Sequence, residues 1–137
     1  MGRSILLTQP SFLRLSCPMV VATGSLGYYH DLAKVFRCGS PRNYNYLFLG
    51  DYVGRGPTNI ECLVCLICNK LMYSQNFFML RGCNDSIAMT RSNKFYDECL
   101  NRFSCKAWTE ACEFLCSLPF AAVIESKIFC VHGGLSP

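Results

Sequence analysis

The stretch that most constrains the fold of this chain is residues 46–56, YLFLGDYVGRG. It opens with four apolar residues, a run whose length and type are typical of a buried strand. The run ends at Gly50, and the acidic residue Asp51 follows at once. In α/β proteins metals and phosphates usually bind at the carboxyl ends of the strands, so Asp51 is predicted to lie at such an edge. The alternative is an ordinary strand-to-helix loop in which Asp51 caps the next helix.

Arg55 lies in the same loop, between Gly54 and Gly56. A guanidinium close to a carboxylate-bound metal is well suited to bind phosphate through two parallel hydrogen bonds. The loop therefore combines a candidate metal ligand with a candidate phosphate ligand.

The rest of the chain alternates short apolar runs with segments of helical periodicity. Strands are expected at residues 19–22, 46–49, 77–80, 120–124 and 128–131, helices at 28–37, 60–71, 91–102 and 106–117, a helix end at 4–7 and a loop at 83–90. The last two strands suit a hairpin around a Glu-Ser-Lys turn. Strands alternating with helices predict an α/β fold with a parallel sheet and crossovers, and 137 residues fit one domain.

Three of the expected strands end in glycine-containing loops, and a fourth ends in His132-Gly-Gly. Because the carboxyl ends of parallel strands share one edge, Asp51, Cys83 and His132 are expected to converge. A carboxylate, a thiol and an imidazole are all metal ligands. Taken singly, each residue type more often caps a helix or packs, which is the alternative at each position.

The cysteines are numerous but do not indicate disulfides. Their number is eleven, which is odd, and most fall within helical or strand patterns, so we expect reduced thiols used as small apolar residues. Cys62, Cys65 and Cys68 form a CxxCxxC run, which is part of some iron–sulfur signatures. The run lies within a helical apolar pattern, which favours core packing instead. His30 is expected to be a solvated residue on a helix surface.

Charge and hydropathy exclude two classes of partner. The net charge is +4 and the basic residues are scattered, so nothing predicts nucleic-acid binding. No apolar stretch approaches the length of a membrane span, and the N-terminal segment lacks the uninterrupted core of an export signal. The expected location is cytoplasmic, nuclear or both.

Several of these segments together closely resemble the metal-dependent serine/threonine protein phosphatases, and among them the type-1 phosphatases. NYLFLGDYVGRG resembles the GDxVDRG motif with its strand, NFFMLRGCND resembles FFLLRGNHE, and LPFAAVI and KIFCVHGGLSP match in order, so that the resemblance spans residues 3–137. It implies a calcineurin-like metallophosphatase fold, in which two sheets pack face to face between helices. Residues 1–137 would form the N-terminal half of one catalytic domain, with a βαβαβ core, further helices and a C-terminal hairpin. Half a sandwich is expected to leave a sheet face uncovered, which would make the chain marginally stable or dependent on a partner.

The resemblance also implies a site that holds two divalent metals, manganese, iron or zinc, beside a catalytic histidine. Asp51 stands at the position of the bridging carboxylate, His132 at that of a histidine ligand and Arg55 at that of a phosphate-binding arginine. Cys83 replaces an asparagine ligand. These positions keep part of the family's metal and phosphate chemistry.

Four other positions lack the family's functional groups. The first family motif, GDxHG, falls on residues 23–27, where Gly24 and Leu26 stand at two metal-ligand positions. Asn84 stands at the catalytic histidine, and Gly54 at the aspartate that supports it. An amide has no titratable proton and cannot act as a general acid.

The resulting expectation is a degenerate phosphatase-like protein without catalytic activity, which binds either no metal or one metal weakly. Its expected partners are phosphatase regulatory proteins or phosphoproteins. The alternatives are an active metal-dependent phosphoserine/phosphothreonine phosphatase, a single-zinc site made by Asp51, Cys83 and His132, and a gene product without function.

Overall fold

A computed structural model describes residues 8–134, so the helix end expected at residues 4–7 lies outside the described part. The elements follow one another as β1 (Phe12–Leu15), β2 (Met19–Ala22), α2 (Tyr29–Val35), the 3-10 turn η1 (Phe36–Cys38), β3 (Asn45–Phe48), α3 (Asn59–Met72), β4 (Phe77–Met79), α4 (Ile87–Ser92), α5 (Lys94–Arg102), α6 (Cys105–Cys116), β5 (Ala121–Ile124) and β6 (Ile128–Val131). The α/β class and the C-terminal hairpin are confirmed.

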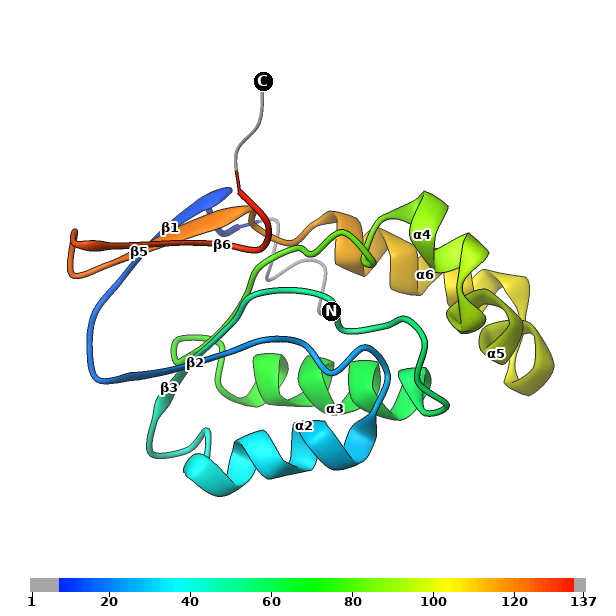
Figure 1. Ribbon diagram of the computed structural model, residues 1–137, viewed down its shortest axis with the longest axis horizontal. Helices are drawn as coiled ribbons and strands as arrows, with labels where there is room; N and C mark the ends of the chain where they lie inside the picture. Colours follow the sequence, from blue (N-terminus) through cyan, green and yellow to red (C-terminus); the bar gives the residue numbers. More distant parts are fainter. Residues whose placement is uncertain (1–7, 135–137) are drawn as a thin grey trace.

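The strands form two three-stranded sheets. In the first sheet β2, β3 and β4 run parallel in that order, joined by crossovers through α2 and α3. In the second sheet β5 lies between β1, to which it is parallel, and β6, to which it is antiparallel. Figure 1 shows the second sheet on one side of β2 and β3, with α2 and α3 on the other side and α4, α5 and α6 gathered at one end.

The alternation of side chains along β3 explains why the three residues that follow Asn45 are all apolar. Tyr46 and Phe48 are fully buried in a core cluster formed with the helices. Leu47 is fully buried in a second cluster that also contains residues of β1, β5 and β6. A strand that is covered on both faces needs apolar residues at every position, unlike one with a solvated face.

Strand β1 was not expected from the sequence, and its presence changes the interpretation of the sandwich. Its residues alternate, with Leu13 and Leu15 buried and Phe12 and Arg14 exposed. Its partner β5 lies more than a hundred residues further along the chain, so the pairing leaves no local signal. The partial sandwich thus contains strands of both sheets, and the second sheet covers one face of the first. The outer face of the second sheet carries the exposed rings of Phe12 and Phe129, so a sheet face does lie uncovered, as expected.

The segment after β4 also differs from the expectation. The predicted loop at residues 83–90 is cut short, because Ser86 accepts a hydrogen bond from the Met89 amide and α4 begins at Ile87. The predicted helix at 91–102 is split at Asn93, whose side chain accepts from the Phe95 amide at 2.9 Å and caps α5. Asn93 therefore ends α4 and, as the N-cap residue, begins α5.

Lys70 of α3 is a buried cation whose ammonium Nζ donates to the carbonyl oxygens of Ser74 at 3.0 Å and Phe77 at 2.6 Å. Burial lowers its pKa from 10.5 to about 8. Because the folded state favours the neutral amine, the stability that this group contributes is present above pH 10.5 and is lost as the pH falls through 8.

The unfolding free energy of the wild type relative to Lys70→Met is therefore expected to rise by about 3 kcal/mol between pH 7.5 and 10.5. Urea unfolding across this range measures the difference. Lys106→Met is the matched control, because the Lys106 side chain is 82% exposed. If the difference in unfolding free energy between wild type and variant changed with pH by the same amount for Lys70→Met as for Lys106→Met, the pKa of Lys70 would not be depressed.

None of the helices in the described region is both long enough and apolar enough to cross a membrane.

Candidate metal and phosphate site

The candidate site begins where β3 ends. Gly50 has φ +103° and Asp51 has φ +66°, so the chain turns sharply through the left-handed region directly after the strand. This conformation is uncommon for a residue with a side chain, and it has to be held by its surroundings. Part of the support is a hydrogen bond that the Asp51 amide donates to the carboxylate of Asp85, at 2.9 Å.

Asp85 ties the two loops of the site together. Its fully buried carboxylate accepts hydrogen bonds from the amides of Gly82 at 2.8 Å, Asp51 at 2.9 Å and Tyr52 at 3.0 Å. Burial raises the pKa of Asp85, and the charge of Asp51 adds to this, while the three amides act against it. Sequence reasoning missed this residue, although Asp85 stands at the final acidic position of the segment that resembles FFLLRGNHE.

Asp85→Ala is expected to destabilise the fold by about 3 kcal/mol, because three buried amides lose their acceptor at once. Chemical denaturation measures the loss. Asp97→Ala, at an exposed position in α5, is the control and should change stability by less than about 0.5 kcal/mol. A small effect at Asp85 would mean that the loops are held by other contacts.

Asp51, Cys83 and His132 do lie together, with their potential ligand atoms all within 4.8 Å of one another. The Cys83 thiol is 3.8 Å from Asp51 Oδ2, and His132 Nε2 is 3.3 Å from Asp51 Oδ1. The three side chains therefore converge as expected, but the shared edge of the parallel strands explains the positions of Asp51 and Cys83 only. His132 follows β6, an antiparallel strand of the second sheet, rather than a strand of the parallel sheet.

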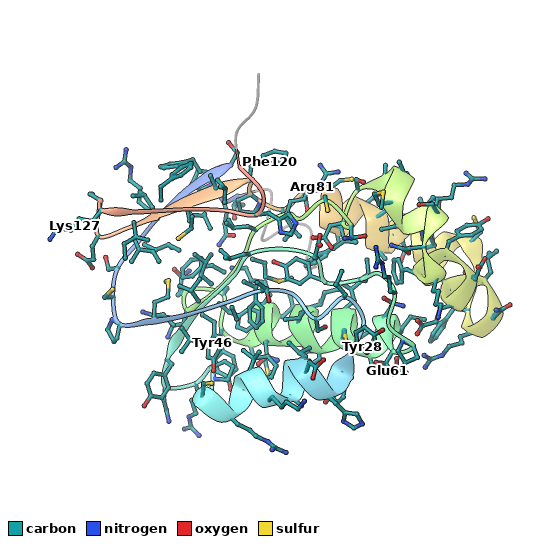
Figure 2. The ribbon with its side chains drawn as sticks, in the orientation of Figure 1. Tyr28, Tyr46, Glu61, Arg81, Phe120 and Lys127 are labelled. Carbon is teal, nitrogen blue, oxygen red and sulfur yellow. The ribbon has the colours of Figure 1, made fainter. Side chains whose placement is uncertain are left out.

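The two sheets are joined beside the site by the segment that leaves β4. The amide of Arg81 donates to the carbonyl of Pro119 at 2.8 Å, and its guanidinium lies over the ring of Phe120. Figure 2 shows Arg81 and Phe120 side by side at this junction. The contact brings the loop that carries Cys83 against the start of the hairpin that carries His132.

The orientation of His132 is fixed by its other ring nitrogen. Nδ1 lies 2.8 Å from the carbonyl oxygen of Leu49. A carbonyl can only accept, so Nδ1 carries the hydrogen and donates it. Nε2 is then the atom that faces Asp51.

The carboxylate of Asp51 accepts two hydrogen bonds from Asn84. The Asn84 amide nitrogen donates to Oδ1 at 2.8 Å, and its side-chain Nδ2 donates to Oδ2 at 2.7 Å. Both carboxylate oxygens therefore have a hydrogen-bond donor from within the chain.

The loop of Gly24 packs closely on the Asp51 turn. The Gly24 amide donates to the Gly50 carbonyl at 2.8 Å, and the Leu26 amide donates to the Asp51 carbonyl at 3.0 Å. A Cβ added at Gly24 would overlap both of those carbonyl oxygens. A Cβ at Gly54 would meet the Leu26 side chain at 3.0 Å, so Leu26 fills the space beside Gly54. The backbone thus leaves no room for a side chain at position 24.

The sequence pattern of the calcineurin-like phosphoesterases matches residues 20–137. The chain belongs to this family. The structure of a serine/threonine phosphatase from Saccharomyces cerevisiae, described as similar to human phosphatase PP5, superimposes with a TM-score of 0.93 at 28% identity. That match covers 98% of this chain and 45% of the yeast chain, so the present chain spans less than half the length of that relative.

A second structure, a putative diadenosine tetraphosphatase, has a TM-score of 0.64 at 16% identity, over 91% of this chain and 56% of its own. At that identity it supports the fold alone. The resemblance to a phosphatase family and the partial metallophosphatase fold are thereby confirmed.

Calcineurin-like phosphoesterases generally use divalent metals, and the donors present here fit one ion better than two. Gly24 and Leu26 offer no donor atom, and Gly24 has no space for one. Among residues 8–134, Asp51, Cys83 and His132 form the one group of three His, Cys, Asp or Glu side chains close enough to share an ion. Three protein ligands with an open fourth position are a familiar zinc arrangement.

Three other candidates in this calcineurin-like phosphoesterase chain do not belong to that group. Arg55 is exposed, and its guanidinium makes no hydrogen bond or ion pair with the described residues. The CxxCxxC run lies on α3, where Cys62 is fully buried in the core, Cys65 is partly buried against it and Cys68 is exposed. The predicted core packing therefore holds for Cys62 and is wrong for Cys68. His30 is exposed on α2.

Proposed function

We propose that this chain is a catalytically inactive serine/threonine phosphatase-like protein. The observation that supports this most is the environment of Asp51. Its carboxylate accepts two hydrogen bonds from Asn84, and its backbone carbonyl packs against Gly24, where the family resemblance places a metal ligand. Two of the four lone-pair sites of the carboxylate that would bridge two metals are thus used by Asn84, which leaves fewer for metal ions.

Two chemical deficits follow from these residues. An asparagine at position 84 cannot protonate a leaving alkoxide, and general acid catalysis is typically worth about 10²–10⁴-fold. Without a second ion, the site lacks the paired charges that generate the nucleophile and stabilise the in-line transition state. Together these losses remove turnover of phosphoserine and phosphothreonine.

The test is hydrolysis of a phosphoserine peptide by the purified chain with manganese, compared with Asp51→Ala prepared in the same way. We expect equal, background rates, because Asp51 has no catalytic role left to lose. A metal-dependent rate at least tenfold above that of Asp51→Ala would overturn the proposal. The variant also controls for contaminating phosphatases, since both preparations would carry them.

In place of hydrolysis we propose that the chain binds phosphorylated proteins in the cytoplasm or nucleus. The support is Arg55, an exposed guanidinium in a glycine-flanked loop that no described residue neutralises. Such a group can bind a phosphate through two hydrogen bonds. A phosphopeptide should therefore bind more tightly than its unphosphorylated form, and Arg55→Ala should abolish the difference. Arg37→Ala, an exposed arginine in η1, should preserve it.

An active phosphatase is the second candidate, and the proximity of Asp51 and His132 favours it. Their side chains lie 3.3 Å apart, and Arg55 is present in the same loop as Asp51. Hydrolysis that needs Asp51, His132 and Arg55 alike would establish this candidate.

A further inference from the structure

We propose that the groove between α3, α5 and α6 is a docking site for an amphipathic helix of another protein, one that carries basic residues beside its apolar face. The groove has a volume of about 610 Å³. None of the residues that line it belongs to the metal and phosphate site, so the inference goes beyond the proposed function.

The wall formed by α3 is an apolar stripe. Ile60, Val64 and Ile67 line the groove at the spacing i, i+4 and i+7, which places them on one face of the helix. The Val64 side chain is 53% exposed, whereas Leu63 beside it is buried in the core. An exposed aliphatic stripe that adjoins the core is a surface on which a further helix packs.

The wall formed by α6 consists partly of small residues. Ala107 and Ala111 are one turn apart, and both line the groove. Their side chains end at Cβ, so they leave open the space that a larger apolar residue would fill. The buried rings of Phe95 and Phe114 lie at the base of this space. Apolar side chains around an unfilled space forgo packing contacts, which the side chains of a docked helix would supply.

The charge of the groove indicates the kind of helix. Of the described residues that line it, Glu110 and Glu113 are acidic and none is basic, although the chain as a whole has a net charge of +4. Lys106 lies 3.9 Å from Glu110, but both side chains are largely exposed, and such a long surface ion pair contributes little. Acidic residues at the edge of an apolar groove favour a partner with lysine or arginine at the matching positions.

The shape of the groove favours a helix over an extended peptide. From Ile60 to Ile67 the rise along α3 is about 10 Å, or about two helical turns. Helices that bind in grooves commonly present anchors at i, i+3 or i+4, and i+7, which cover the same distance. An extended peptide usually binds by pairing with a strand edge, and the walls of this groove are helices.

The experiment is a titration of a fluorescein-labelled peptide of about 15 residues with the reduced chain, followed by fluorescence anisotropy. The peptide has leucine along one helical face and lysine at the other positions. We expect saturation at one peptide per chain. A peptide with glutamate in place of lysine should bind at least about tenfold more weakly, and added salt should weaken binding of the lysine peptide.

Variants of the two walls locate the peptide. Ala111→Leu fills the groove and should weaken binding at least about tenfold, while its thermal unfolding midpoint stays equal to that of the wild type or rises. Ala107→Leu is a second variant of the same kind. Ala88→Leu is the matched control, because Ala88 is exposed on α4, outside the groove. Glu110→Gln combined with Glu113→Gln should abolish the preference for the lysine peptide.

Binding that is equal in the wild type and in both filled variants, or that does not occur, would overturn the proposal. Equal binding of a scrambled leucine–lysine peptide, which lacks an apolar face, would also overturn it. Sedimentation equilibrium tests another occupant. A wild-type dimer that Ala111→Leu converts to a monomer would show that a second copy fills the groove, and the proposal would be wrong. No readout involves phosphate, so failure here would leave the proposed function standing.

Discussion

Replacing Gly24 by Asp is expected to destabilise the protein by about 3 kcal/mol and to leave it without phosphatase activity. The family resemblance places a metal ligand at this position, so the substitution would at first sight restore the site. The structure gives the opposite expectation, because a Cβ at Gly24 overlaps the carbonyl oxygens of Gly50 and Asp51. Backbone atoms on both sides of the overlap have to move, and the hydrogen bond from the Gly24 amide to Gly50 is lost or distorted.

Two alanine variants separate the steric effect from the effect of charge. Gly24→Ala should account for most of the destabilisation, because the overlap begins at Cβ. Gly133→Ala should be close to neutral, since a Cβ there meets nothing within 4 Å. Urea unfolding of the three variants measures the differences. If Gly24→Asp were as stable as the wild type and bound an additional metal, the packing account of the site would be wrong.

Restoring the acid pair alone, with Asn84→His and Gly54→Asp, is expected to give no measurable gain in hydrolysis of a phosphoserine peptide. A general acid accelerates a reaction only when a nucleophile attacks, and the nucleophile of this family comes from water on the metals. Leu26→Ala is included in the variant, because the Leu26 side chain lies 3.0 Å from the position of a Cβ at Gly54.

The size of the effect makes this test decisive. With a working metal centre, the restored acid should raise the rate by about 10²–10⁴-fold. The measurement is kcat/KM for the peptide, with Leu26→Ala alone as the control. A gain of a hundredfold or more would show that the metals are in place and that position 84 is the principal defect.

Much of the first sheet could be predicted from the sequence, because its signals are local. The strand within residues 46–49 is apolar throughout, which is typical of a strand covered on both faces, and it ends at a Gly-Asp turn. The convergence of Asp51 and Cys83 follows from the shared edge of parallel strands. The family resemblance then supplied the fold and the correspondence of positions.

Features that depend on distant partners could not be predicted. Strand β1 pairs with β5, far along the chain, so its four residues gave no separate signal. The end of α4 at Asn93 depends on a single capping residue within an otherwise helical pattern. The buried role of Asp85 depends on amides from two loops, and the closeness of the Gly24 loop to Asp51 is a matter of backbone packing, which sequence patterns do not report.

The central claim is that the donor atoms around Asp51 and His132 are too few to bind two ions. Counting manganese ions per chain by native mass spectrometry tests it most directly, because this hard ion is bound poorly by the many free thiols. The account predicts at most one manganese ion per chain, in the wild type and with excess metal. Two manganese ions per chain, both lost in Asp51→Ala, would contradict it.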